Sequence, residues 1–339
     1  MNLTPSISAI SSASSASSAS SISSGPSVPA GGALLVSGAS GALARQAIAL
    51  LQQHRPDVPL IATTRHPDRL ADLAASGVSV RFADFDQPDS LASAFEGASR
   101  MLLVSTNTVD APPRRVTQHR NAIEAARRCG VQHVVYTSFA TAGAAQPGPI
   151  AADHAATEQL LREGPGGFSV LRNAFYAELL LATLPLACRS HRLPCAPGRG
   201  RMTYVARSDC AAAAAAALAD GFEGRRVLSI AGEEALDAHT LAALASEVLG
   251  VRIEAVETAP DQLEAAWTGC GASAGMARVF AGIDRGMAKG EMEVRESDLR
   301  ALLGALPPCE PMDMRAFLLA HRAVIVAPPS AAAVAATAS

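Results

Sequence analysis

The chain has 339 residues, of which 49% are hydrophobic, and a net charge of −3. It contains no run of about 18 consecutive apolar residues, so we expect no transmembrane helix, and its charge argues against a nucleic-acid or anionic-membrane partner. Its six cysteines are scattered, without Cys-x-x-Cys or zinc-finger spacing, so we expect reduced thiols, a cytoplasmic protein and no metal site.

The first and last segments lack the composition of a folded domain. Residues 1–31 are rich in serine and alanine, and the first charged residue of the chain is Arg45. Such a tract buries too little apolar surface to offset the entropy lost on ordering, so we expect a disordered extension. A secretory signal needs a basic start and a transit peptide needs arginines, and the tract has neither. The tail 323–339, rich in alanine, proline and valine, is also expected to be disordered.

The region 34–51 predicts a strand, a glycine turn and a helix in succession. Its apolar start is typical of a strand buried on both faces, and apolar residues then recur at helical spacing. Gly38 permits a sharp turn, and Gly41 lets backbone N–H groups approach a pyrophosphate at the positive end of the helix dipole. Because the spacing is G-x-x-G-x-x-A and not G-x-G-x-x-G, an ordinary strand–helix turn is the alternative to a dinucleotide site.

Strand-like and helix-like segments alternate in the first half of the chain. Strands are expected at 34–36, 59–64, 78–83, 100–105, 133–138 and 168–172, with helices at 68–76, from 88, after Pro112 and Pro113 to about 128, and at 153–163. This order predicts an α/β fold with a doubly wound parallel sheet, an NAD(P)-binding Rossmann fold, over 32–186. A smaller α+β cap is expected over 187–322, with some segments returning to the sheet; its elements are predicted at 226–230, 238–249, 251–255, 260–267 and 297–303.

Two arginines follow the second expected strand. At this position NAD-binding proteins usually carry an acidic residue that binds the ribose hydroxyls. Here the strand ends in Thr63-Thr64-Arg65, Arg69 follows, and no carboxylate stands at the strand tip. Arginine can stack on adenine and pair with a 2′-phosphate, so we expect both arginines to bind the cofactor and NADP(H) to be preferred over NAD(H). An exposed loop arginine is the alternative.

Polar and aromatic residues follow three further strands, at the sheet edge where ligands of such folds bind. Asp84 and Phe85 are candidates to flank an adenine ring, with a turn residue beside a core phenylalanine as the alternative. The small polar candidates for contact with ribose or nicotinamide are Ser105, Thr106, Asn107, Thr137 and Ser138. Taken singly, each is also typical of a loop cap.

The chain lacks the Tyr-x-x-x-Lys pair with which short-chain dehydrogenases transfer protons. Lys289 is the only lysine, and it does not stand four residues after Tyr136, Tyr176 or Tyr204. A nucleotide-sugar epimerase or dehydratase needs that pair, so this class is disfavoured. The G-x-S-x-G elbow of a hydrolase is absent as well.

Five motifs carry a family resemblance: GASGALA, TRHPDR and ADFDQPDSL after the first three strands, QHRNAIEAARRCGVQHVVYTS through the fourth helix and fifth strand, and SVLRNAFYAELL at the sixth strand. Over about 33–322 the chain resembles the NmrA-like branch of the atypical short-chain dehydrogenase/reductases, and within it the type 2 NAD(P)H:quinone oxidoreductases. The resemblance implies hydride transfer from NADP(H) directly to a quinone-type small molecule, without flavin or metal.

The same resemblance assigns site residues. The implied pyrophosphate loop comprises Gly38, Ala39, Ser40, Gly41, Ala42 and Leu43. The implied 2′-phosphate contact is Arg65, and the implied contacts after the fourth strand are Ser105, Thr106 and Asn107. The implied nicotinamide-side segment comprises Asn173, Ala174, Phe175, Tyr176, Ala177 and Glu178.

Tyr176 is the candidate catalytic residue, in an orienting role. Without a lysine nearby we expect its pKa to stay near about 10, so that it donates a hydrogen bond and is not an essential acid. Two departures from the family pattern concern the site. Ala44 replaces the third glycine, which affects the packing of helix on strand, and Phe175 and Leu179 stand where Trp and Asn are expected in the quinone pocket.

Two functions stay open at this point. A quinone accepts a hydride readily, so an NADPH-dependent quinone reductase fits the missing proton-transfer pair. A non-enzymatic NADP(H)-binding redox sensor that regulates a partner fits it equally well. We expect a small-molecule ligand, with no nucleic-acid or membrane partner and with a homodimer as an open alternative.

Deletion of residues 1–30 should leave folding and cofactor affinity unchanged, because this chargeless tract precedes the first expected strand. The melting temperature and the NADPH dissociation constant of the truncated and full-length chains should agree within error. A truncated chain that is insoluble, or that melts several degrees lower, would show that the tract packs on the domain.

Overall fold

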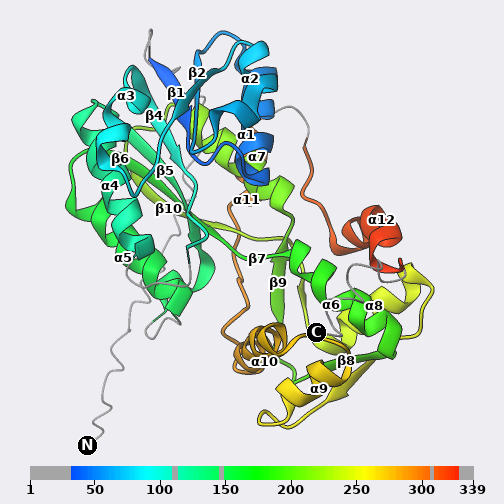
Figure 1. The fold of residues 1–339 in the computed structure, drawn as a ribbon. Coiled ribbons are helices and arrows are strands. Elements are labelled where there is room, and N and C mark those ends of the chain that lie inside the picture. Colours follow the sequence, from blue (N-terminus) through cyan, green and yellow to red (C-terminus); the bar gives the residue numbers. More distant parts are fainter. Residues whose placement is uncertain (1–31, 109–113, 145–148, 306–308, 328–339) are drawn as a thin grey trace, which may run out of the picture.

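The computed structural model describes residues 32–108, 114–144, 149–305 and 309–327 (Figure 1). The expected extension 1–31 and the prolines expected before the fourth helix, Pro112 and Pro113, lie outside these ranges. Helix α12 (Met314–Ile325) continues into the expected tail 323–339, because the Ile325 side chain is buried in the core of the cap. The tail beyond 327 lies outside the described residues.

A seven-stranded parallel sheet forms the larger half of the structure, which confirms the predicted fold class. Its strands lie in the order β10-β6-β5-β4-β1-β2-β3. Their bounds are β1 (Ala33–Val36), β2 (Leu60–Thr64), β3 (Ser79–Phe82), β4 (Ala98–Leu103), β5 (His133–Phe139), β6 (Gly167–Asn173) and β10 (Arg225–Ile230). The chain reverses its direction of winding between β1 and β4, where doubly wound sheets bind ligands at their carboxyl ends.

Helices cover both faces of this sheet (Figure 1). One face carries α3 (Leu91–Phe95), α4 (Arg114–Arg128) and α5 (Pro149–Glu163), and the other carries α1 (Ala42–His54), α7 (Arg207–Ala219) and α11 (Leu299–Leu303). Successive residues of β1 point to opposite faces, so Leu34 and Val36 enter one core and Leu35 enters the other. The alanine-rich middle of α7 is fully buried, because its small side chains permit close approach to α1 and the sheet.

The smaller half is a cap with its own apolar core. Its elements are α6 (Leu180–Ser190), β8 (Arg192–Cys195), α8 (Ala238–Leu249), β12 (Glu254–Glu257), α9 (Leu263–Gly269), α10 (Ala274–Ala288) and α12. The core of the cap begins at Ala177 and not at the expected boundary of 187, because Leu180 and Leu184 of α6 pack into it. The sequence did not predict α6, α10, α12 or β8, and it placed β12 at 251–255.

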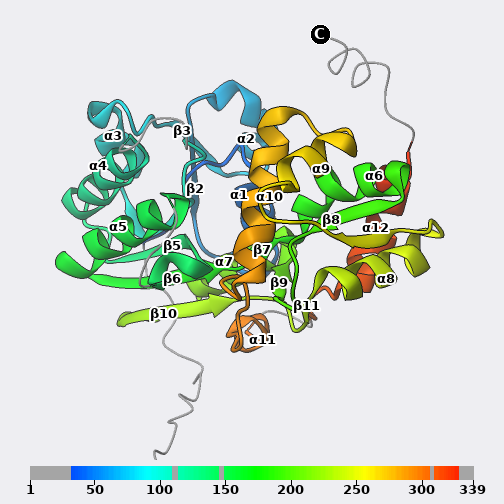
Figure 2. The same ribbon diagram turned by 90° about the horizontal axis from the view of Figure 1, so that it is seen from below.

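A short three-stranded sheet joins the two halves. Strand β7 (Phe175–Tyr176) follows β6 almost directly and pairs in parallel with β9 (Met202–Val205), which also pairs with β11 (Ala235–Leu236). The cap therefore sits against the carboxyl ends of the large sheet. Figures 1 and 2 show α10 on the side of the cap that is nearest to the large sheet.

The described residues contain no helix that is both long and apolar enough to cross a membrane. In the same parts of the chain, no cluster of three or more His, Cys, Asp or Glu side chains has the arrangement of a metal site. The cysteines of the described ranges are all free thiols.

Candidate functional site

The turn after β1 has the geometry of a phosphate-binding loop. Gly38 adopts a left-handed backbone with φ of 62°, which residues with side chains rarely tolerate. The Ala39 N–H donates to the Thr63 carbonyl at 3.0 Å, and the Gly41 N–H donates to the Gly38 carbonyl at 2.8 Å. These bonds tie the turn to β2 and close it on itself, while its tip, 40–42, stays exposed.

The N-terminus of α1 is available to an anion. The first N–H groups of a helix have no intrahelical acceptor, Gly41 supplies no side-chain cap, and the first turn carries no acidic residue. Leu43 and Ala44 are buried against the sheet, so the exposed tip presents mainly backbone. Ala44, in place of the family's third glycine, lies wholly inside this packing layer. The loop therefore fits a pyrophosphate group, which is bound by such N–H groups.

Arg65 and Arg69 lie exposed beyond the end of β2. The Arg69 carbonyl accepts a hydrogen bond from the Arg45 guanidinium at 3.1 Å, and Arg45 also pairs with Asp72 at 2.6 Å. Within the described ranges, no acidic side chain forms an ion pair with Arg65. Both candidate guanidinium groups are therefore available at the strand tip, beside the Gly38 turn.

Asp84, a candidate to flank adenine, is engaged in its own turn. Its Oδ1 accepts the Asp86 N–H at 3.0 Å, and its Oδ2 accepts the Gln87 side-chain amide at 3.2 Å. Phe85 packs against the core on the α3–α4 face, and its carbonyl accepts the Asn121 side-chain amide at 2.8 Å. These contacts favour the alternative of a turn residue beside a core phenylalanine, and the adenine contact stays a prediction.

Two side chains of α4 clamp the peptide of Thr106 at the end of β4. The Thr106 N–H donates to His119 Nε2 at 3.0 Å, and the Thr106 carbonyl accepts from Arg115 Nε at 2.7 Å. Burial lowers the pKa of His119 to about 3, so its ring is neutral and able to accept. The Ser105 N–H donates to Thr137 Oγ1 at 2.8 Å, which joins the ends of β4 and β5. The sequence did not predict these two contacts, although the spacing of Arg115 and His119 places them on one helix face and was a signal.

The last two polar candidates at this edge differ in their surroundings. Asn107 is exposed, whereas Ser138 is buried and its Oγ donates to Glu158 Oε1 at 2.7 Å. Glu158 also pairs with Arg172 at 2.7 Å, and although burial opposes it, the hydrogen bonds from Arg172 and Ser138 lower the pKa of Glu158. Ser138 thus has a structural partner, and Asn107 is the more available to a ligand.

The segment after β6 carries an incompletely paired amide. Asn173 Nδ2 donates to the Tyr176 hydroxyl at 3.2 Å, while Asn173 Oδ1 is buried without a partner among the described residues. An unpaired buried acceptor costs about 1–3 kcal/mol, so this oxygen suits an N–H donor on a ligand, such as the amide of a nicotinamide. The Arg207 guanidinium lies over the Tyr176 ring, 5.4 Å from its centroid.

The expectation of an ordinary pKa for Tyr176 is wrong. Burial raises the pKa of its hydroxyl well above about 10, because the residue lies where the cap covers the end of the sheet. Tyr176 therefore stays protonated at all working pH values, and its hydroxyl is suited to donate a hydrogen bond.

The neighbours of Tyr176 have packing and capping contacts. The Phe175 ring lies edge-on to Phe139, with 4.9 Å between the ring centroids. The Glu178 carboxylate accepts the Arg207 N–H at 3.1 and 3.2 Å, and so caps the N-terminus of α7. The buried alanines of the segment are Ala174 and Ala177.

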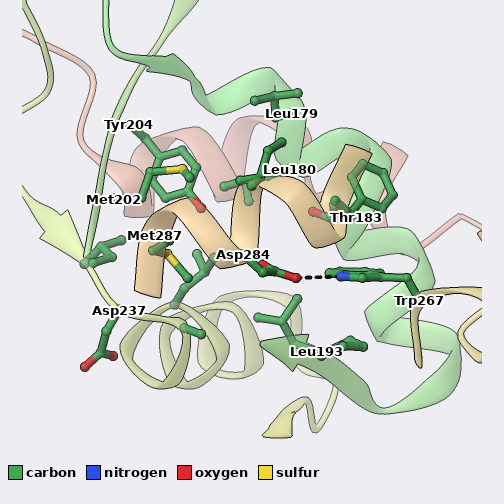
Figure 3. Close-up of a pocket in the computed structure, with 16 residues that line it drawn as sticks. Leu179, Leu180, Thr183, Leu193, Met202, Tyr204, Asp237, Trp267, Asp284 and Met287 are labelled. Carbon is green, nitrogen blue, oxygen red and sulfur yellow. Dashed lines mark hydrogen bonds between the residues drawn. The ribbon is translucent and has the colours of Figure 1, made fainter. Parts of the chain in front are cut away.

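A cavity of about 570 Å³, part of it open to solvent, lies in the cap between α6, α8, α9 and α10 (Figure 3). Its walls are mostly apolar, with Leu180, Leu193 and Met287 among them. Asp284 and Tyr204 bring polar groups to it. Tyr204 belongs to β9, so this cavity, the cap pocket, adjoins the predicted nicotinamide-side segment in β7.

Asp284 is the buried carboxyl of the cap pocket. Its Oδ2 accepts the Trp267 Nε1–H at 2.7 Å (Figure 3). Burial raises the pKa of Asp284 to about 7, against the opposing effect of the Trp267 hydrogen bond. The sequence did not predict a role for Asp284, although an acidic residue within the apolar stripe of α10, between Phe280 and Met287, was a signal.

Comparisons with known proteins agree with this geometry. Residues 38–221, which begin at the glycine turn, match a family described as NAD(P)H-binding. The chain is 32% identical over 271 residues to Quinone oxidoreductase 2 of Escherichia coli (strain K12), covering 80% of this chain and 93% of that protein. It is 30% identical over 235 residues to an NmrA-like family domain-containing oxidoreductase of Aspergillus flavus, covering 67% of this chain and 75% of that protein.

A solved structure with the same fold is the triphenylmethane reductase of Citrobacter sp., in complex with NADP(H). It matches with a TM-score of 0.73 at 31% identity, covering 81% of this chain and 96% of that chain. These findings confirm the resemblance drawn from the sequence motifs and an NAD(P)H-binding oxidoreductase at the level of the family. They do not test the individual site residues, which stay predictions.

Replacing Asp284 with asparagine should change how stability depends on pH. The folded-state pKa of Asp284, about 7, lies above the ordinary value of 3.8. Between these two pH values the carboxyl is ionised in the unfolded chain but protonated in the folded chain, so the free energy of unfolding falls as pH rises. The free energy of unfolding of Asp284→Asn should therefore exceed that of the wild type by roughly 2–4 kcal/mol at about pH 8.5 and match it at about pH 4.

Urea unfolding at both pH values measures this difference. Asp261→Asn, an exposed position in the same cap, is the matched control and should behave as the wild type at both pH values. If the free energy of unfolding of Asp284→Asn does not increase relative to the wild type as pH rises, the raised pKa of Asp284 is contradicted.

Proposed function

We propose that this chain, which belongs to the NmrA-like family of NAD(P)H-binding proteins, is an NADPH-dependent oxidoreductase that reduces a quinone-type small molecule. The observation that carries the proposal is the uncapped N-terminus of α1 behind the left-handed Gly38 turn, at the point where the sheet order reverses. One relative is named for the reduction of a quinone, and this supports the choice of acceptor.

The residues at the sheet edge fit NADP(H). The N–H groups of α1 would hold the pyrophosphate, Asn107 would contact a ribose, and Asn173 Oδ1 would accept from the nicotinamide amide. Arg65 and Arg69 support a 2′-phosphate, because both are exposed beyond the end of β2 and neither forms an ion pair with an acidic side chain of the described residues. When bound, the nicotinamide supplies the hydride.

Arg65→Ala should weaken NADPH binding and leave NADH binding nearly unchanged, because only NADPH carries the 2′-phosphate. Loss of such a charge-assisted contact costs about 1.5–3 kcal/mol, which corresponds to a roughly tenfold or greater rise in the dissociation constant. Calorimetric titration with each cofactor measures the effect, and Arg278→Ala, an exposed arginine in the cap, is the control. An equal loss for both cofactors would contradict the assignment.

Orientation accounts for the chemistry in this proposal. A quinone is a good hydride acceptor, so positioning supplies much of the rate and a strong acid is dispensable. The hydride reduces the quinone to a hydroquinone anion, which takes its proton from water. Tyr176 stays protonated and packs against the core of the large sheet, outside the lining of the cap pocket. From that side it would donate a hydrogen bond that orients the acceptor or stabilises the oxygen on which negative charge develops.

Tyr176→Phe should lower kcat/KM by roughly 10–100-fold, or about 1.4–2.7 kcal/mol of transition-state stabilisation. The variant keeps the ring beneath Arg207 but removes the hydroxyl that accepts from Asn173 Nδ2, so the NADPH dissociation constant is measured as well. Stopped-flow NADPH oxidation by both proteins makes the comparison. A loss below about threefold would mean that Tyr176 only lines the site, and complete inactivation with the NADPH affinity retained would make it an essential acid.

Steady-state NADPH oxidation with a panel of quinones tests the function itself. Turnover by protein that lacks flavin absorbance and has been treated with a chelator would support direct transfer without flavin or metal. A protein that binds NADPH but oxidises it with no quinone and no triphenylmethane dye would favour the redox-sensor alternative. The cytoplasmic location and the homodimer stay predictions.

A further inference from the structure

We propose that the cap pocket binds the quinone, with one of its carbonyl oxygens accepting hydrogen bonds from the Asp284 carboxyl and the Tyr204 hydroxyl. This inference deepens the proposed function, on which its choice of ligand rests. Figure 3 shows the two residues approaching the cavity from α10 and β9, with Trp267 beside Asp284 and hydrogen-bonded to it.

The free polar atoms of the cap pocket are few and specific. Trp267 occupies one carboxyl oxygen of Asp284, Oδ2, and the other oxygen, Oδ1, has no partner among the residues that the structure describes. The Tyr204 hydroxyl also makes no side-chain hydrogen bond within those ranges. The remaining lining is dominated by Leu, Ile, Met and Phe side chains. A planar, uncharged molecule with a carbonyl oxygen fits such a site, because its ring replaces water on the walls while its oxygen pairs with the donors.

The charges around Asp284 favour a neutral acceptor. Burial raises the pKa of Tyr204 and raises the pKa of Cys195, on β8, to about 11, so both stay protonated. The pKa of Asp237, at the start of α8, is lowered to about 2 by a hydrogen bond from the Thr240 N–H, and Asp237 is paired with Arg199. Arg285 lowers the pKa of Asp284, but this effect is smaller than that of burial. Below about pH 7 Asp284 is thus a neutral donor, and above it a carboxylate faces the carbonyl oxygen.

The pocket is close to the expected site of hydride transfer. Tyr204 lies directly opposite Phe175 in the β7–β9 pair, and neighbouring strands are about 4.8 Å apart. Phe175 in turn contacts Phe139 at the end of β5. An acceptor held by Tyr204 and Asp284 is therefore one strand away from the segment predicted to bind nicotinamide.

Trp267 is the only tryptophan of the chain and contacts Asp284, so its fluorescence reports on this pocket alone. Titration of the full chain with 1,4-naphthoquinone, without cofactor, should give saturable quenching. The dissociation constant should rise roughly 10–30-fold between about pH 6 and about pH 8.5 as Asp284 ionises. Asp284→Asn keeps both a donor and the acceptor for Trp267, so it should bind with the affinity of the wild type at low pH and without pH dependence.

Two further proteins complete the test. Asp284→Leu, which lacks the donor, should bind at least about tenfold more weakly at about pH 6, and Asp261→Asn should match the wild type throughout. Circular dichroism confirms that each variant is folded. Quenching that does not saturate, or that keeps its pH dependence in Asp284→Asn, would overturn the proposal.

NADPH oxidation separates this inference from the proposed function. If the wild type reduces naphthoquinone but Asp284→Asn leaves the pH dependence of the quinone KM unaltered, the pocket assignment fails and the proposed function stands. If quenching is saturable and depends on Asp284 but no quinone is reduced, the binding site stands and the proposed function fails.

Discussion

The pairing of β7 with β9 determines where the two halves of the molecule meet. One continuous segment leaves β6, is tied back to the sheet by the Ala174 N–H on the Ile230 carbonyl, pairs with β9, and caps α7 through Glu178. Because backbone hydrogen bonds and not side chains alone make this connection, the cap pocket has a fixed relation to the carboxyl ends of the large sheet. Both the proposed cofactor site and the proposed acceptor site depend on that relation.

Burial keeps the polar groups around the two sites uncharged. The low pKa of His119 leaves a neutral ring that accepts the Thr106 N–H, and the raised pKa values of Tyr176 and Asp284 leave both protonated below neutral pH. Neutral donors stabilise a developing oxyanion without supplying a strong acid. Such a site suits an acceptor that is already reactive toward hydride, and it explains how the chain can dispense with a Tyr–Lys pair.

The sequence predicted what local pattern determines and missed what depends on tertiary burial. The parallel sheet and the Gly38 turn follow from apolar runs and glycine spacing, which are local. The ordinary pKa expected for Tyr176 was wrong because it took no account of the cap that covers the residue. The start of the cap was placed too late because Leu180 and Leu184 are equally compatible with a helix on the sheet, and the role of Asp284 requires knowing that Trp267, on another helix, lies against it.

The two halves of the molecule also differ in how far the family match extends over them. The family match ends at residue 221, so it includes the glycine turn and the strand ends but excludes Asp237, Trp267 and Asp284. The cofactor half is therefore common to the family, whereas much of the cap pocket lies beyond the matched residues. Relatives of similar identity are named for a quinone and for a triphenylmethane. In the proposed site, a protonated Asp284 suits a neutral quinone, and a carboxylate at the same place would suit a cationic acceptor. The ionisation of this one residue would therefore bear on which acceptor the cap pocket binds.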